Sequence, residues 1–444
     1  MSILENTRKE QTVQTRKIVL IGAGSRSFGL CQVVDILRSQ ELTGRNFTFT
    51  LVDQNETALD LMTRIAHRVK ERTGSDIVIE STTDRRVALK NATYVVTSVA
   101  RQRMALWEQD FRVPLAYGFN HCLGENGGPG AIFHALRSFE LIVPICRDIE
   151  EICPNAFLLN FTNPEARVLN AICHLTKVKA AGICHGVFGV VRLIAKTLNR
   201  PVEELQVISA GMNHFYCVLK VIDKKTGKDL YDDVLKKLKD PSAELPPLAR
   251  KILDIFDIIT FPSDDHIGEY LSFGAEFGGI KWHYGREVKK VPLVDPPAEG
   301  NWLEPFAAGQ KNIADLFNSS GEITVPIIGD MELDRGTFRE AVNVLNADHY
   351  IENLPADAVI EVPATVDAKG LHPLKVGPIP EPFACTMRTQ FSIHKLLTEA
   401  YRTRSKKLLL QALLLDPNVN RITAAEKLLD DMLALQSDFL PEFS

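Results

Sequence analysis

The feature that most limits how this chain can fold is an apolar run, a glycine-rich turn and an amphipathic segment near the N-terminus. The apolar run at residues 17–21 leads into a turn that holds Gly22 and Gly24, and apolar residues then recur at helical spacing over Leu30–Arg38. Strand, glycine turn and helix in this order open a dinucleotide-binding βαβ unit. Gly22 would allow the tight turn, and Gly24 would let the backbone approach a pyrophosphate at the helix N-terminus. Ser27 stands at the third glycine position, so the match is incomplete.

A second predicted strand, Phe47–Asp53, ends in an acidic residue. A carboxylate at this place can bond a ribose hydroxyl and disfavours a 2′-phosphate, which favours NAD over NADP. The alternative interpretation is that Asp53 caps the predicted helix Glu56–Lys70. Because strand, glycines, helix, strand and acid fall in register, we favour the cofactor interpretation.

Predicted strands and helices go on alternating to about residue 215. This order predicts an α/β fold, with an N-terminal Rossmann-type doubly wound sheet and a C-terminal α+β domain. We therefore divide the chain into a polar tail (residues 1–16), an NAD-binding domain (17–215) and a C-terminal domain (216–444) that completes the active site. In the last part, Glu332–Asn346 is predicted to be helical.

Composition excludes several classes of function. A net charge of −5 over 444 residues gives no electrostatic signature of binding to nucleic acid or to an anionic membrane. No apolar run approaches the roughly 20 residues that cross a bilayer, and the first residues lack a secretory core. We therefore expect a cytoplasmic protein whose 8 cysteines stay reduced and are available as ligands.

One apolar run ends in Cys184-His185, which stand between two glycines. His214 follows 30 residues after Cys184, at the end of the next predicted strand, Leu205–Ala210. If those strands were neighbours in a parallel sheet, thiol and imidazole would meet and could bind Mn²⁺, Fe²⁺, Co²⁺ or Zn²⁺. The alternatives are that Cys184 is a small buried apolar residue and that His214 is structural.

Two further segments are rich in polar side chains. Asn160 and Asn163 precede a proline after a predicted strand, where they suit either hydrogen bonds to sugar hydroxyls or a simple turn. Residues 264–270 hold five titratable side chains in seven positions, which fits an acid–base cluster or a solvated helix start.

Together these motifs resemble glycoside hydrolase family 4, the NAD- and metal-dependent glycosidases. The resemblance runs from Ile18 to about Val419. Its marks are Gly22-Ala23-Gly24-Ser25, Asp53, Gly127-Gly128-Pro129-Gly130, Ala135-Leu136-Arg137, Asn160-Phe161-Thr162-Asn163-Pro164, Cys184-His185, Asn213-His214, Asn353-Leu354-Pro355 and Val359-Ile360-Glu361-Val362-Pro363-Ala364.

The resemblance implies hydrolysis by transient oxidation of the sugar rather than by a pair of carboxylates. A hydride passes from C3 to NAD, a base then removes the C2 proton, the C1 substituent is eliminated, water adds, and the hydride returns. A divalent metal ion, Mn²⁺ first among the candidates, polarises the C2 and C3 oxygens.

The resemblance also implies a role for each matching residue. It assigns the metal to Cys184 and His214, and a general-acid or orienting role to His185. The base that takes the C2 proton is Tyr270 or its rival Asp265. The NAD contacts are Gly22, Gly24, Ser25 and Asp53, and the substrate contact is Asn163.

The segment Cys184-His185-Gly186-Val187 resembles the branch that acts on α-linked uronic acids, because branches acting on 6-phosphosugars carry Asp or Asn after the cysteine. We therefore predict an α-galacturonidase, with an α-glucuronidase second and a neutral α-glucosidase or α-galactosidase third. A uronate needs a cation, for which Arg101, Arg103 and Arg112 are candidates.

The rival interpretations are a 2-hydroxyacid dehydrogenase, which would produce net NADH, and a cofactor-binding regulatory protein without activity. By analogy with the family we expect a homo-oligomer that takes a small glycoside as substrate.

Overall fold

The computed structural model describes residues 15–277, 302–318 and 321–444, so all but the last two residues of the predicted polar tail lie outside it. The described strands are β1 (Arg16–Ile21), β2 (Phe47–Val52), β3 (Val78–Thr82), β4 (Tyr94–Thr97), β5 (Phe157–Asn160), β6 (Lys179–Gly182), β7 (Leu205–Met212), β8 (Phe215–Asp223), β9 (Thr337–Leu345), β10 (Val359–Asp367) and β11 (Gly370–Pro373).

The longer described helices are α1 (Phe28–Arg38), α2 (Glu56–Thr73), α4 (Arg103–Ala116), α5 (Gly130–Ile152), α6 (Glu165–Leu175), α7 (Val187–Leu198), α8 (Tyr231–Leu238), α9 (Pro247–Phe256), α13 (Thr324–Leu333), α14 (Glu381–Thr403), α15 (Lys406–Leu415) and α16 (Ile422–Leu435). The shorter ones are α3 (Arg85–Leu89), α10 (Asp264–Gly268), α11 (Gly274–Phe277), α12 (Glu304–Ala307) and the 3₁₀ turns η1 (Val202–Glu204) and η2 (Ile313–Leu316).

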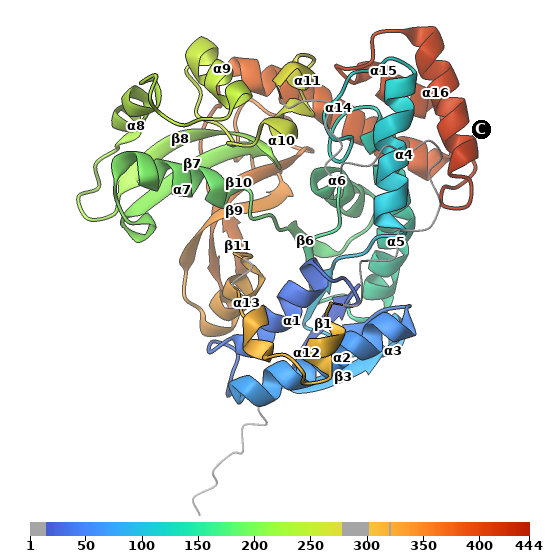
Figure 1. Cartoon of the computed structure of the whole chain (residues 1–444), viewed down its shortest axis with the longest axis vertical. Helices are drawn as coiled ribbons and strands as arrows, with labels where there is room; N and C mark the ends of the chain where they lie inside the picture. Colours follow the sequence, from blue (N-terminus) through green and yellow to red (C-terminus); the bar gives the residue numbers. More distant parts are fainter. Residues whose placement is uncertain (1–14, 278–301, 319–320) are drawn as a thin grey trace, which may run out of the picture.

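One sheet joins all the described strands, in the order β3-β2-β1-β4-β5-β6-β9-β10-β7-β8, with β11 paired to β10 (Figure 1). The six strands from β3 to β6 pair in parallel. One apolar core includes side chains of α5, α6, α14, α15 and α16, and a second includes side chains of α1, α2, α12 and α13. The predicted Rossmann-type doubly wound sheet is confirmed, since crossover helices cover both faces of its parallel part.

The C-terminal part of the chain returns to the N-terminal part in two places. α12 and η2 pack against α2, and α13 packs against α1 (Figure 1). β9 and β10 enter the sheet between β6 and β7, and β9 pairs antiparallel with β6 and with β10. The two halves of the sequence therefore share one sheet.

The predicted helix over Glu332–Asn346 is wrong for most of its length. α13 ends at Leu333, and residues 337–345 form strand β9. Asp334 and Gly336 have φ values of 50° and 61°, which stop the helix. The following segment then gains ladder hydrogen bonds and packing against β10, and such tertiary pairing overrides a local helical pattern.

A search of the described residues finds no helix that is both long and apolar enough to cross a membrane.

Candidate active site

Cys184 and His214 lie in contact, with the Cys184 Sγ atom 3.3 Å from Nε2 of His214. Cys184 stands two residues beyond β6, and His214 lies in the turn between β7 and β8 with a φ of 62°. The sequence predicts this contact on the assumption that β6 and β7 are neighbours in a parallel sheet. That assumption is wrong, because β9 and β10 lie between them. The turn after β7 therefore brings the imidazole to the thiol across two inserted strands.

Burial shapes the protonation of this pair. Burial, and to a smaller extent the nearby Glu361 carboxylate, raises the pKa of the Cys184 thiol, while hydrogen bonds from Gly186 N–H and the Asn213 side chain act against that rise. Burial and the neighbouring His266 and His185 hold the pKa of His214 well below its usual range. Without a nearby cation, the thiol keeps its proton and the imidazole is neutral.

The same residues fit a divalent metal ion. Nδ1 of His214 is buried and has no hydrogen-bond partner among the described residues. A neutral imidazole and a thiol that a cation can deprotonate suit Mn²⁺, Fe²⁺, Co²⁺ or Zn²⁺. Within the described ranges, no cluster of three or more His, Cys, Asp and Glu side chains could hold a metal ion. A metal bound by this pair would thus keep open positions for substrate oxygens.

His185, the predicted acid, is joined to a buried carboxylate. Its Nδ1 lies 2.6 Å from Oε1 of Glu322, and the Glu322 side chain is only 3% exposed whereas that of His185 is 52% exposed. The hydrogen bond to Glu322 raises the pKa of His185 above its usual value. The imidazole is thus fixed at Nδ1, which leaves Nε2 for another partner.

The acidic segment before Tyr270 reaches the metal pair through a histidine that sequence reasoning did not select. Oδ1 of Asp265 lies 3.0 Å from Nδ1 of His266, and the His266 ring packs edge-on against that of His214 with centroids 4.6 Å apart. The only sequence signal for His266 was its place among the five titratable side chains at 264–270.

Tyr270, the first candidate for the base, is buried behind these residues. It is 2% exposed, and its hydroxyl donates to the carbonyl oxygen of Asn213 at 3.2 Å. Burial, together with the neighbouring Glu269, raises the pKa of Tyr270 well above its usual range. The Tyr270 hydroxyl is thus held by the backbone beside His214, whereas Asp265 reaches the His214 ring through His266.

A second carboxylate cluster lies beside the predicted substrate contact. Glu125 is bound by Arg103 at 2.7 Å and lies 3.4 Å from Nδ2 of Asn163. Glu269 accepts the backbone N–H groups of Glu125 and Asn126 at 2.7 and 3.0 Å, and burial raises the pKa of Glu269 to about 7. The sequence analysis included Glu269 in the titratable cluster at 264–270 but missed its contact with the backbone of Glu125, since nothing local pairs residues 144 apart.

A cleft of about 1140 Å³ runs along the carboxyl ends of the parallel strands. Its lining includes five predicted residues for the cofactor and the substrate carboxylate, which are Gly22, Gly24, Ser25, Asp53 and Arg101, together with Asn163. Of the candidate cations for a uronate, Arg103 is paired with Glu125 and Arg112 with Glu108, whereas exposed Arg101 forms no ion pair with any described residue.

The glycine turn is shaped by its neighbours. Gly22 has a φ of 92°, and a Cβ atom there would lie 2.0 Å from the carbonyl oxygen of Ser98. The N–H of Gly24 donates to Oδ2 of Asp53 at 2.8 Å, which joins the turn to the end of β2. Asp53 does not cap α2, because that helix is capped by Asn55, whose side chain accepts from Ala58 N–H.

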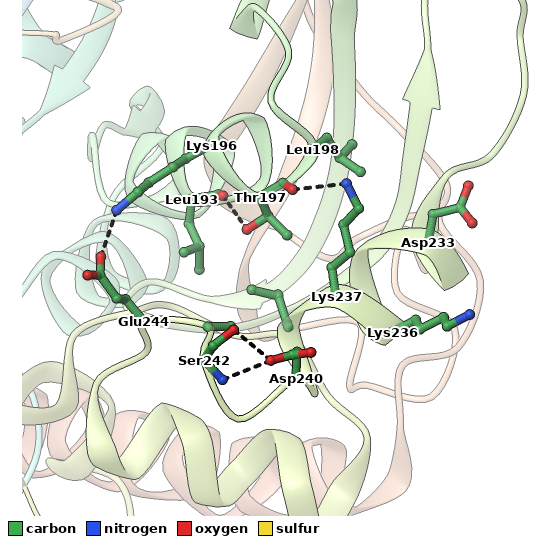
Figure 2. A pocket seen from close by; sticks show the side chains of 12 residues that line it. Leu193, Lys196, Thr197, Leu198, Asp233, Lys236, Lys237, Asp240, Ser242 and Glu244 are labelled. Atoms are coloured by element: carbon green, nitrogen blue, oxygen red, sulfur yellow. Dashed lines mark hydrogen bonds and ion pairs between the residues drawn. The ribbon is translucent and has the colours of Figure 1, made fainter.

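A second cavity of about 850 Å³ lies between α7, α8 and the loop that follows α8 (Figure 2). Lys196 is paired there with Glu244, and Lys237 donates to the carbonyl oxygen of Thr197. None of the predicted site residues lines this cavity.

Comparison with known proteins places this geometry in a family. Residues 17–200 match the family described as "Family 4 glycosyl hydrolase", and residues 209–419 match the family described as its C-terminal domain. The chain is 31% identical to an alpha-glucosidase of Erwinia rhapontici, a match that covers 96% of this chain and 98% of the relative. It is 30% identical to an alpha-galactosidase of Bacillus subtilis, over 96% of this chain and 100% of the relative.

An alpha-galacturonidase of Lachnoclostridium phytofermentans is 25% identical, over 96% of this chain and 97% of the relative. A crystal structure of a 6-phospho-alpha-glucosidase from gut microorganisms, in complex with NAD and Mn²⁺, has the same fold. Its TM-score is 0.81 at 21% identity, over 97% of this chain and 100% of that one.

Proposed function

Because this chain belongs to family 4 of the glycosyl hydrolases, we propose that it hydrolyses α-glycosidic bonds of unphosphorylated sugars with NAD and a divalent metal ion, Mn²⁺ first, as cofactors. The observation that carries the proposal is the contact between Cys184 and His214. It is supported by curated relatives at 30–31% identity, which are an alpha-glucosidase and an alpha-galactosidase, and by the NAD and Mn²⁺ in a neighbouring structure.

The cleft along the parallel strands would hold the dinucleotide. Gly22 and Gly24 form a tight turn that lines this cleft, and Asp53 has lone pairs left for a ribose hydroxyl beside its bonds to Gly24 N–H and Asn55 N–H. The chemistry supplied by the bound groups is a reversible hydride transfer at sugar C3 and polarisation of the C2 and C3 oxygens. Cys184 and His214 would hold the metal.

The protein's own side chains would move the protons. His185, fixed at Nδ1 by Glu322, would donate a proton from Nε2 to the departing oxygen. Nε2 of His266, whose Nδ1 is held by Asp265, would take the C2 proton. We rank this pair above Tyr270, because the buried phenol already donates to a backbone carbonyl and holds its proton tightly. Asn163, beside Glu125, would bond a sugar hydroxyl.

The first candidate substrate is a neutral α-glucoside. The relative at 31% identity is an alpha-glucosidase. Two carboxylates hold the histidines beside the metal pair, Glu322 on His185 and Asp265 on His266, and such a surrounding disfavours an anionic sugar unless a cation is close.

The α-galacturonide predicted from the Cys184-His185 pair is the second candidate. Its specific support is Arg101, which lines the cleft without an ion pair among the described residues and could bind a uronate carboxylate. An alpha-galacturonidase at 25% identity, aligned over almost the whole chain, supports it as well.

The experiment is an assay of nitrophenyl α-glucoside, α-galactoside, α-galacturonide, α-glucuronide and 6-phospho-α-glucoside, each with NAD and Mn²⁺ and each without one of them. We expect turnover of an unphosphorylated sugar that needs both cofactors, with no net gain in NADH absorbance. Turnover of the phosphorylated sugar alone, turnover that needs neither cofactor, or a stoichiometric gain in NADH from a 2-hydroxyacid would overturn the proposal.

A substitution at Arg101 tests which of the two sugars, the galacturonide or the glucoside, depends on this side chain. Replacing it by leucine should raise KM for the galacturonide by about 10-fold or more, the loss expected for one charge-assisted hydrogen bond. The same change should leave KM for the glucoside within about 2-fold, because a neutral sugar offers no carboxylate to this side chain. Equal effects on both sugars would exclude Arg101 as the group that binds a uronate.

A further inference from the structure

Four residues in register across the sheet connect the two strands that lead to the metal pair. Gly182 of β6 pairs with Asn343 of β9, Asn343 pairs with Glu361 of β10, and Glu361 pairs with Gly211 of β7. The two glycines stand at the outer places of this row, and the amide and the carboxylate stand between them. A buried amide and a buried carboxylate thus fill the sheet between the ends of β6 and β7.

Side-chain hydrogen bonds run along this row. Nδ2 of Asn343 donates to Oε2 of Glu361 at 3.3 Å and to the carbonyl oxygen of Gly182 at 3.4 Å. Oε2 of Glu361 also accepts from Nδ2 of Asn213 at 3.3 Å. One carboxylate oxygen is therefore shared by amides from β9 and from the turn that carries His214.

Asn213 carries the connection on to the metal pair, because it precedes His214 in the turn after β7. At the other end of the row, Gly182 lies two residues before Cys184. The row of hydrogen bonds therefore joins the backbone beside one expected ligand to the backbone beside the other. A carboxylate that orients the group next to a ligand is the usual way in which outer partners tune a metal site.

We propose that Glu361 and Asn343 are positioning residues of the metal site, which hold the turn of Asn213 and His214 in place against the end of β6 and so set how Cys184 and His214 meet a divalent cation. The inference rests on the proposed function only for the existence of that metal ion. It assigns the amide and the carboxylate no contact with substrate.

The test measures metal affinity of the purified full-length chain without substrate, with Co²⁺ as the probe. The dissociation constant comes from calorimetry, and the near-ultraviolet thiolate-to-Co²⁺ absorption reports the bond to sulfur. Glu361→Gln keeps one acceptor oxygen but removes the carboxylate charge that strengthens the bonds from Asn213 and Asn343. It should raise the dissociation constant by about 10- to 100-fold, the usual loss when an outer partner is changed, and should change that absorption band.

Asn213→Ser tests the same link from its other end and serves if Glu361→Gln does not fold cooperatively. It should weaken Co²⁺ binding by a similar factor. The double variant should be little weaker than either single one, because both changes break one connection. The matched control is Asp416→Asn, another carboxylate that is 2% exposed but contacts Asn418 instead, and it should bind Co²⁺ like the unchanged chain.

The outcomes separate this inference from the proposed function. Co²⁺ binding to the unchanged chain, with equal affinity and an equal absorption band in Glu361→Gln and Asn213→Ser, overturns the inference and leaves the proposed function standing. If the losses of Co²⁺ affinity in the two single variants add up in the double variant, Glu361 and Asn213 do not act through one shared connection. No Co²⁺ binding to the unchanged chain overturns the metal site and the inference together.

Discussion

The sulfur of Cys184 lies 3.3 Å from Nε2 of His214, although two other strands separate β6 from β7 in the sheet. If this contact holds the metal, Cys184→Ser should lower kcat/KM by about 10³-fold or more, because Lewis-acid catalysis contributes several kcal/mol to the barrier. Assays of kcat/KM with Mn²⁺ in excess measure this loss. Cys385→Ser, which changes an exposed thiol on α14, should keep full activity, and an equal loss in both variants would contradict the assignment.

Asp53 should govern the affinity for the dinucleotide. Its two oxygens accept the N–H groups of Gly24 and Asn55, so Asp53→Asn removes a charge-assisted bond to the glycine turn as well as the acceptor for a ribose hydroxyl. We expect the dissociation constant for NAD to rise by about 10- to 100-fold, from a loss of about 1.5–3 kcal/mol. Titration of NAD into the metal-free chain measures it. Asp76→Asn, an exposed change before β3, is the control and should leave NAD binding unchanged.

Glu269 and Glu361 should each make a contribution to the stability of the metal-free chain that falls as the pH rises. Burial raises the pKa of Glu269 and of Glu361 from 4.5 to about 7 in the folded chain. At these two groups the folded state therefore binds more protons than the unfolded state between about pH 4.5 and pH 7, and their contribution to stability falls with rising pH across that window. Below about pH 4.5, each group contributes on the order of 3 kcal/mol to the free energy of unfolding.

Glu269→Gln should remove this falling contribution, so the free energy of unfolding in urea should fall less steeply, or rise more steeply, from pH 5 to pH 8 than in the unchanged chain. The glutamine cannot ionise and still occupies the same space. A slope that stays unchanged would show that Glu269 is not protonated in the folded chain near neutral pH.

A buried ion pair between α4 and α5 also holds the end of the C-terminal helix α16. Nη1 of Arg137 on α5 donates to Oδ1 of Asp110 on α4 at 2.9 Å and to Gln436 at the end of α16 at 2.6 Å. Arg137→Met leaves a buried carboxylate without its cation and should cost about 3–5 kcal/mol of unfolding free energy. Arg147→Met changes an exposed ion pair on the same helix and should cost less than about 1 kcal/mol. Similar urea midpoints for both variants would contradict this difference.

The features that could be predicted from the sequence are local ones. The run before Gly22, the turn to Gly24 and the acid at Asp53 lie within one βαβ unit, so spacing alone places them together. The strand β9 was mistaken for a helix, because its conformation is decided by pairing with β10, which comes later in the chain.

The partners of the candidate site residues could not be predicted for the same reason. Glu322 meets His185 from 137 residues away, and Glu269 meets the backbone of Glu125 from 144 residues away. Such contacts depend on how the C-terminal part folds back on the sheet, which no short pattern records. The resemblance pointed to Cys184 and His214, but the carboxylates that orient their neighbours became visible only in the folded chain.

The measurement that tests the central claim most directly is hydrolysis in D₂O with NAD and Mn²⁺, followed by NMR of the released sugar. If the sugar is oxidised at C3 and loses its C2 proton to a base, the product should carry solvent deuterium at C2. A product that keeps ordinary hydrogen at C2 would contradict the account, since hydrolysis by a pair of carboxylates never breaks that bond.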